Sequence, residues 1–130
     1  MPNKKNSGFT LLEVMLAMSI IAIALVAVFG MQSQSLSLFS EAKFYTTASL
    51  LAQVKIAEIE AEKPDELVSR SGDFGDDFSE YFWETKVSNV IFPGAEDISE
   101  YIKQIDLKLN YGEQDIYQYS VRFYRFFPKK

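Results

Sequence analysis

The sequence has no cysteine and no histidine among its 130 residues. Without cysteine there is no disulfide and no thiol nucleophile, and without both residue types a Cys/His zinc site is excluded. Serine–histidine and cysteine–histidine catalytic pairs are excluded for the same reason. These absences remove the common hydrolase arrangements. We therefore expect a protein that is not an enzyme and that uses no cofactor.

Basic residues are also few, with 13 Lys and Arg against 18 Asp and Glu, a formal net charge of −5 and a sequence pI near 4.7. They form no continuous stripe of the kind that neutralises nucleic-acid phosphates. The sequence thus predicts no nucleic-acid partner.

An uncharged apolar stretch from Val14 to Met31 dominates the N-terminal part of the chain. Its length is at the lower end of what spans a bilayer as a helix. Lys4 and Lys5 precede it and should stay on the cytoplasmic side, which leaves the C-terminal part outside. Because Ala27-Val28-Phe29 does not supply an A-x-A pattern for signal peptidase, we expect the apolar segment to remain as an anchor.

A helical pattern continues beyond the apolar stretch as far as Lys63, and no proline interrupts residues 9–63. In the second half, apolar residues fall within one arc of the helix, which suits the covering of a sheet. These residues are Tyr45, Ala48, Leu51, Ala52, Ile56 and Ile59. Lys55 lies inside the arc and should extend to its edge. Pro64 should end the helix.

Three strand-like segments follow, at residues 81–91, 101–111 and 116–127. A short polar link with Gly112 joins the last two as a hairpin. Residues 69–77 are expected to form an irregular loop. The fold class predicted is α+β, in which a long N-terminal helix spans a membrane with its first half. Its second half packs on a small antiparallel sheet of three to four strands.

The expected faces of these strands follow from alternation. One face of the sheet should carry Trp83, Thr85, Val87, Ile105, Leu107, Leu109, Tyr111, Tyr117, Tyr119, Val121 and Phe123. Many of the aromatic residues should therefore line the core between helix and sheet, rather than form a ligand-binding platform.

One carboxylate, Glu13, lies near the start of the apolar segment. An acidic residue at the centre of a spanning helix costs about 2.5–3.5 kcal/mol on insertion scales, so such a group usually has a partner. No basic side chain lies between Ser7 and Ser40. A cut just before Phe9 would create an α-amino group that is largely cationic at neutral pH, since its pKa is about 7.7–8.0. The alternative is that Glu13 is an incidental charge at the membrane interface.

Residues 4–13 resemble the processing signal of the type IV pilin superfamily, in which a short basic leader ends in glycine before an aromatic residue. Here these are Gly8 and Phe9, and Glu13 is the fifth residue after the cut. The resemblance implies that a prepilin peptidase cuts between Gly8 and Phe9 and methylates the new Phe9 amine. It also implies that Glu13 pairs with the Phe9 amine of a neighbouring subunit during assembly, although a pair within one helix is also compatible with the i, i+4 spacing.

The chain further resembles the minor pseudopilin I of type II secretion systems in TLLEVMLAMSIIAIALVAVFGMQSQSL, LLAQVKIAEI and SGDFGDDFSEYFWETKV. This implies a bacterial inner-membrane protein with one span and a periplasmic domain. It would assemble with J- and K-like minor pseudopilins and the major pseudopilin at the tip of a pseudopilus. Two alternatives stay open: a minor pilin of a type IV pilus or DNA-uptake machinery, and a membrane-tethered periplasmic ligand-binding module.

The expected organisation has three parts: a cleaved leader (1–8), a transmembrane or filament-core helix (9–31) and a periplasmic domain (32–130) that includes the second half of the long helix. Within the domain, the loop expected at residues 69–77 carries Asp73, Asp76 and Asp77, and Glu80 lies nearby. Calcium sites occur in related pseudopilins, but this spacing does not match an EF-hand loop. We expect these carboxylates to be solvated and predict no metal site.

Overall fold

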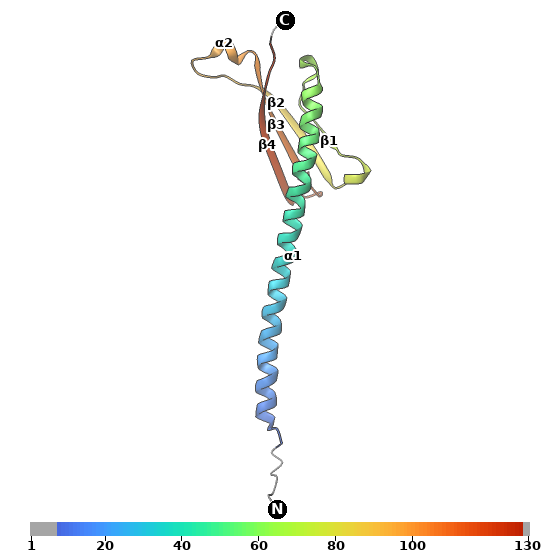
Figure 1. Ribbon diagram of the computed structural model, residues 1–130, viewed down its shortest axis with the longest axis vertical. Helices are drawn as coiled ribbons and strands as arrows, with labels where there is room; N and C mark the ends of the chain where they lie inside the picture. The colour runs from blue at the N-terminus through green and yellow to red at the C-terminus, as the bar shows by residue number, and fades with distance from the viewer. Residues whose placement is uncertain (1–7, 129–130) are drawn as a thin grey trace, which may run out of the picture. The chain divides into compact units, whose positions relative to one another are not determined.

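The structure, a computed structural model, describes residues 8–128 and has an α+β fold (Figure 1). The expected leader therefore lies outside the described residues, apart from Gly8. A long helix α1 (Leu11–Ala61) precedes a four-stranded antiparallel sheet of order β1-β2-β3-β4. The strands are β1 (Arg70–Asp73), β2 (Tyr81–Asn89), β3 (Ile102–Tyr111) and β4 (Tyr117–Phe126), and a short helix α2 (Glu96–Ser99) precedes β3.

The chain divides after Ser40 into two compact units, so that α1 contributes to both. In the first unit, the described residues 8–40 are all exposed. The second unit, residues 41–130, contains the sheet and the buried core. The predicted long helix packed on an antiparallel sheet is thus confirmed, with the packing made by the second part of α1.

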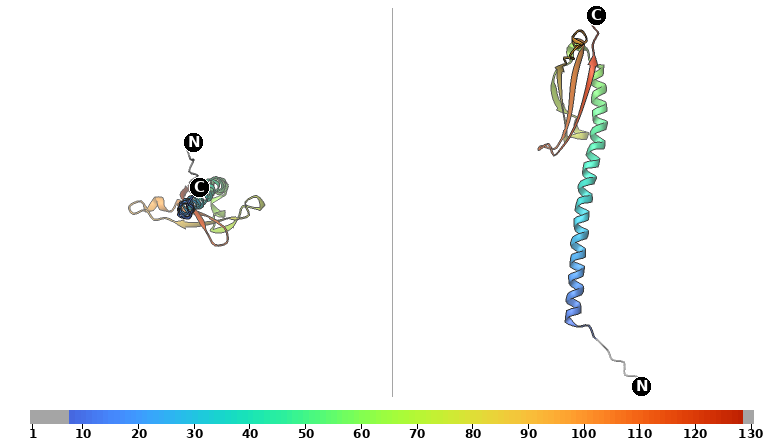
Figure 2. Two further views of the ribbon diagram at one scale, coloured as in Figure 1. Left: turned by 90° about the horizontal axis from the view of Figure 1, so that it is seen from below. Right: turned by 90° about the vertical axis from the view of Figure 1, so that its left-hand side faces the viewer.

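The second part of α1 lies along one face of the sheet (Figure 2). Its buried residues are Phe44, Ala48, Leu51, Ala52 and Ile59, and Ile56 is partly buried. The prediction was wrong for Tyr45, which is 44% exposed, whereas Phe44 is 2% exposed. Phe44 stacks on the rings of Tyr81 and Tyr117 from the sheet, with centroid distances of 6.0 and 5.3 Å. These aromatic partners, which are remote in sequence, decide which of two adjacent rings enters the core.

The alternation of inward and outward residues in β2, β3 and β4 is confirmed. Ile105, Leu107 and Leu109 of the central strand β3 are fully buried. Their neighbours in register, Val87 and Phe123 for Ile105, also face the helix side of the sheet. The core therefore forms where three strands align their apolar positions under one helix.

The loop predicted at residues 69–77 is wrong in part, because Arg70–Asp73 form the edge strand β1. This strand pairs with β2, and Gly72 lies opposite Trp83. A Cβ atom at position 72 would lie 2.8 Å from Cζ2 of Trp83, so only glycine fits beside the indole ring without a shift. The indole Nε1 also donates a hydrogen bond of 2.9 Å to the carbonyl oxygen of Asp73. A segment with little intrinsic strand propensity is held by these tertiary contacts.

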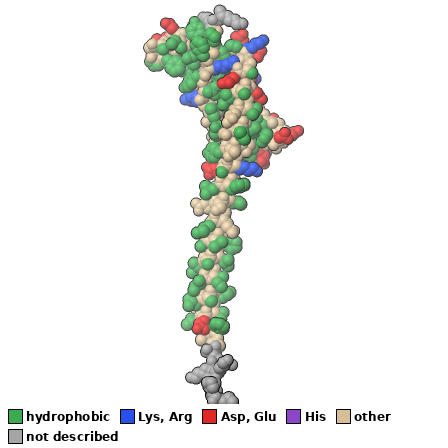
Figure 3. Space-filling view, viewed as in Figure 1, with side chains coloured by type: hydrophobic (Ala, Val, Ile, Leu, Met, Phe, Trp, Pro, Cys, Tyr) green, Lys and Arg blue, Asp and Glu red, His purple; other side chains and the backbone are tan. Residues whose placement is uncertain are grey.

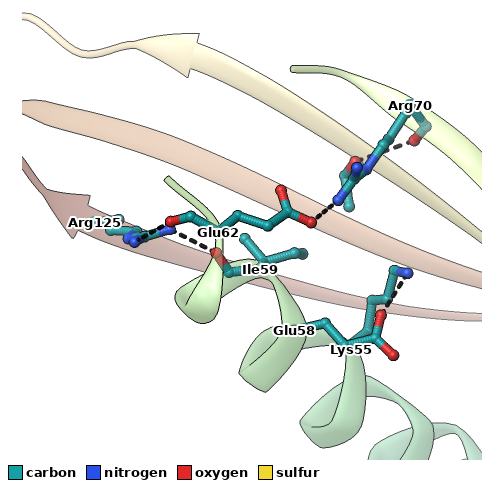
Figure 4. A network of polar contacts seen from close by, with 7 residues as sticks. Lys55, Glu58, Ile59, Glu62, Arg70 and Arg125 are labelled. Carbon is teal, nitrogen blue, oxygen red and sulfur yellow. Dashed lines mark hydrogen bonds and ion pairs between the residues drawn. The ribbon is translucent and has the colours of Figure 1, made fainter. Parts of the chain in front are cut away.

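The C-terminal end of α1 is held by both edge strands (Figure 4). Arg125 of β4 donates hydrogen bonds of 2.5 and 2.7 Å to the carbonyl oxygens of Ile59 and Glu62, and the Glu62 carboxylate pairs with Arg70 of β1. The helix ends at Ala61, before the predicted Lys63. An arginine that satisfies the last carbonyl groups is a favourable C-terminal cap.

Lys55, expected at the edge of the helix stripe, lies with its Nζ atom 3.7 Å from the centroid of the Trp83 ring. The same atom donates a hydrogen bond of 2.8 Å to Glu58. The ammonium group is thus placed over an aromatic face and close to a carboxylate, two arrangements that offset its partial burial.

Candidate functional site

Helix α1 begins immediately after Thr10, at the processing signal expected from the sequence. The Thr10 backbone N–H donates a hydrogen bond of 3.0 Å to Oε2 of Glu13. In return, the Glu13 backbone N–H donates one of 3.2 Å to the Thr10 hydroxyl oxygen. This reciprocal pair is a capping box, which satisfies two of the N–H groups that a helix start leaves without partners.

Thr10 was not among the residues predicted from the sequence, although its signal was present. Thr10-Leu11-Leu12-Glu13 fits the S/T-x-x-E pattern that marks a helix N-terminus. From the sequence, Glu13 was expected to pair with the Phe9 amine that processing creates. The structure gives it a backbone partner in a chain that still carries the residues before Phe9.

Gly8 and Phe9 precede the helix and are fully open to the surroundings. Phe9 is 91% exposed, and none of the described residues from Thr10 onward has an atom within 4 Å of the place where a Cβ on Gly8 would sit. The described residues after the junction therefore impose no steric need for glycine at position 8. A requirement for glycine there must come from a partner such as a processing enzyme.

The apolar side chains that follow are exposed rather than buried in a core. Those of the large apolar residues between Leu11 and Met31 are 49–78% exposed. Among the described residues, α1 is the one helix long and apolar enough to cross a membrane. This segment is compatible with a single-pass membrane anchor.

Two of the four carboxylates considered for calcium accept hydrogen bonds within the protein. Asp73 accepts a hydrogen bond of 3.0 Å from the Gly75 backbone N–H. Glu80 accepts one of 2.5 Å from the Tyr111 hydroxyl, and this bond raises the pKa of Tyr111 above its ordinary value. Within residues 8–128, no group of three or more acidic side chains is arranged to hold a metal ion.

The aromatic residues near the C-terminus divide between two faces of β4. Tyr117, Tyr119 and Phe123 pack toward the core, as alternation predicted, whereas Tyr124 and Phe126 are 53% and 59% exposed on the outer face. Phe92 contacts Tyr124, and Ile91 and Ile98 are exposed in the segment around α2. We call Ile91, Phe92, Ile98, Tyr124 and Phe126 the outer apolar patch. Hydrophobic side chains gather at this end of the domain in Figure 3.

Residues 3–29 match the family model described as the prokaryotic N-terminal methylation motif. The match covers Gly8, Phe9 and Glu13 together with the apolar start of α1. This motif is typical of type IV pilin-like proteins and indicates a subunit of a pilus or pseudopilus. It implies processing by a prepilin peptidase and assembly with other pilin-like proteins. No curated protein and no solved structure matches the chain.

Proposed function

We propose that the protein is a minor pseudopilin of a type II secretion system, which assembles at the tip of a periplasmic pseudopilus and thereby supports protein secretion. It acts as a structural subunit and not as an enzyme. The observation that carries this proposal is the order of features at the N-terminus. An exposed Gly8-Phe9 junction is followed by Glu13 and by a helix whose first part exposes its apolar side chains.

Processing would proceed on the cytoplasmic side of the inner membrane. A prepilin peptidase hydrolyses the peptide bond between Gly8 and Phe9, and the amine released on Phe9 is methylated. The apolar part of α1 then anchors the subunit by one span, with the domain in the periplasm. Because neighbouring helices can replace lipid around such a surface, the same segment can later pack in a filament.

Glu13 would guide assembly by pairing with the Phe9 amine of a neighbouring subunit. A charge-assisted hydrogen bond between a carboxylate and an amine is stronger than one between neutral groups, above all where water is scarce. The domain offers contact surfaces to J- and K-like minor pseudopilins and to the major pseudopilin. These surfaces are the outer apolar patch and the exposed apolar residues Leu50 and Val54 of α1.

The N-terminus of the mature protein tests processing. Mass spectrometry should find a chain that begins at Phe9 with a methylated amine. Gly8→Val should keep its leader, whereas Gly30→Ala, a glycine change within α1 and away from the junction, should be cleaved normally. An intact start, or a cut after the apolar stretch, would favour a membrane-tethered ligand-binding module instead.

Glu13 variants test assembly. Glu13→Ala should insert and be cleaved, because it makes the anchor more apolar, but it should cross-link poorly to partner subunits and lower secretion. Glu13→Gln should be nearly as defective, since it keeps the shape and loses the charge. Loss of pili or DNA uptake with normal secretion would assign the chain to the minor pilins. Wild-type cross-linking in both variants would show that the carboxylate is dispensable.

A further inference from the structure

Thr10 contributes two atoms to the start of α1, and both contact Glu13. Its hydroxyl oxygen accepts from the Glu13 backbone N–H, and its own backbone N–H donates to Glu13 Oε2. Within residues 8–128, Glu13 Oε1 has no hydrogen-bond partner. One carboxylate oxygen is therefore fixed at the helix start, and the other is available for a second donor.

All atoms of this capping box lie on the C-terminal side of the expected cut. The Thr10 N–H belongs to the Phe9–Thr10 peptide bond, which processing leaves intact. Methylation modifies the nitrogen of Phe9 and not that of Thr10. The box can therefore exist before the cut, when no amine is present, and persist after it.

We infer that Thr10 is a positioning residue that fixes the Glu13 carboxylate through the capping box, so that Oε1 is presented to the amine of a neighbouring subunit. This inference rests on the proposed function, because it concerns the same carboxylate. Before processing, the box gives Glu13 a polar partner near the apolar segment and lowers the cost of an isolated charge there. After processing, it limits the side-chain freedom that Glu13 would otherwise lose on pairing.

The variants Thr10→Val and Thr10→Ser separate this role from a general effect of the residue. Valine has nearly the shape of threonine but no acceptor, whereas serine is a good helix cap. Thr10→Val should lower cross-linking of the processed full-length chain to partner subunits by about fivefold, which corresponds to the loss of one cap. Thr10→Ser should restore it. Ser19→Ala removes another hydroxyl of the same segment, one that donates to the Met15 carbonyl oxygen, and should have no effect.

A double variant tests whether Thr10 acts through Glu13. If it does, Thr10→Val combined with Glu13→Gln should be no more defective than Glu13→Gln alone, because the group being positioned is already lost. If the cross-linking defect of the double variant equals the product of the two single-variant defects, the inference is overturned. Normal cross-linking in Thr10→Val together with a defect in Glu13→Gln would overturn it too, while leaving the proposed function in place. Normal cross-linking in Glu13→Gln would instead show that the carboxylate is dispensable, which overturns this inference and the role proposed for Glu13 in assembly.

Amide hydrogen exchange gives a measurement that does not depend on processing or on partners. In the full-length chain in detergent micelles, NMR should show the Glu13 amide protected in the wild type and in Thr10→Ser. Thr10→Val should accelerate its exchange several-fold, while the amide of Ser19 exchanges unchanged. Equal protection of Glu13 in all three proteins would show that the box does not form and would overturn the inference.

Discussion

The two parts of α1 are both rich in apolar residues but arrange them differently around the helix. From Leu11 to Ser40 no side chain is buried, and apolar residues occur on every side of the helix. From Glu41 to Ala61 the buried residues fall on one face, while Gln53, Glu58 and Glu60 lie in exposed positions. A helix apolar all round needs lipid or other helices as its surroundings, whereas a one-sided stripe is covered by a single sheet. The distribution of apolar residues around the helix therefore indicates what covers each part.

Within residues 41–61 of α1, the buried and the exposed face should differ most in how much a substitution lowers the stability of the domain. Two adjacent leucines test this difference. Leu51 is 7% exposed and Leu50 is 58% exposed. Leu51→Ala should lower the free energy of unfolding of the domain by about 2–5 kcal/mol, because it leaves a cavity in the core. Leu50→Ala should change it by less than about 0.5 kcal/mol. Urea unfolding followed by the fluorescence of Trp83, the single tryptophan, measures both. Equal losses would contradict the one-sided core.

Gly72 and Gly30 test the same difference, because an added methyl group meets a close neighbour only in the packed domain. Gly72→Ala places a methyl group against the Trp83 ring and should cost about 1–3 kcal/mol of domain stability. Around Gly30 there is open space within 4 Å, so Gly30→Ala should leave unfolding monitored at Trp83 unchanged. A neutral Gly72→Ala would mean that β1 moves away from β2 at little cost.

Loss of the arginine cap at the C-terminal end of α1 should lower the stability of the domain somewhat less than loss of the core leucine does. Arg125→Met keeps much of the side-chain length but leaves the carbonyl oxygens of Ile59 and Glu62 without their charged donor, and we expect a loss of about 1–3 kcal/mol. Arg122→Met serves as the control, since Arg122 pairs with Asp106 on the exposed outer face. The control should lose clearly less in the same unfolding experiment. A greater loss in the control would refute the importance of the cap.

The outer ion pair should produce a small pH dependence. The hydrogen bond from Arg122 holds the pKa of Asp106 below its ordinary value of 3.8. This bond therefore contributes stability above the unfolded-state pKa, and that contribution is lost as the pH falls through the lower folded-state pKa. Urea midpoints measured between pH 7 and pH 2.5 should decline less in Asp106→Asn and in Arg122→Met than in the wild type. Parallel declines in all three proteins would exclude this contribution.

The smallest effect is expected from removal of the first part of α1. A fragment that lacks residues through about 35 should keep the stability of the domain within about 0.5 kcal/mol, because no residue from 8 to 40 is buried. Comparison of its Trp83 unfolding curve with that of the full chain in detergent gives the answer. A fragment that stays unfolded both alone and with partner pseudopilins would show that the two parts are not independent.

The candidate site is the part of the molecule that depends least on the fold. Gly8, Phe9 and Glu13 were selected from a contiguous pattern, and their roles remain predictions that the variants above address. Thr10 could have been found in the same way, because a capping box joins residues only three positions apart. Both residues of the capping box, Thr10 and Glu13, lie within one short stretch of the sequence.

The sequence by itself also determined the apolar segment, the inward faces of β2, β3 and β4, and the α+β class, since each depends on a periodicity that neighbouring residues express. The tertiary structure alone decided three other features. Arg70–Asp73 became a strand because β2 and Trp83 lie beside it; Phe44 rather than Tyr45 entered the core because three tyrosine rings of the sheet surround it; and Arg125 capped α1 from β4. In each case the deciding partner is distant in sequence, and no local pattern encodes which distant groups will meet.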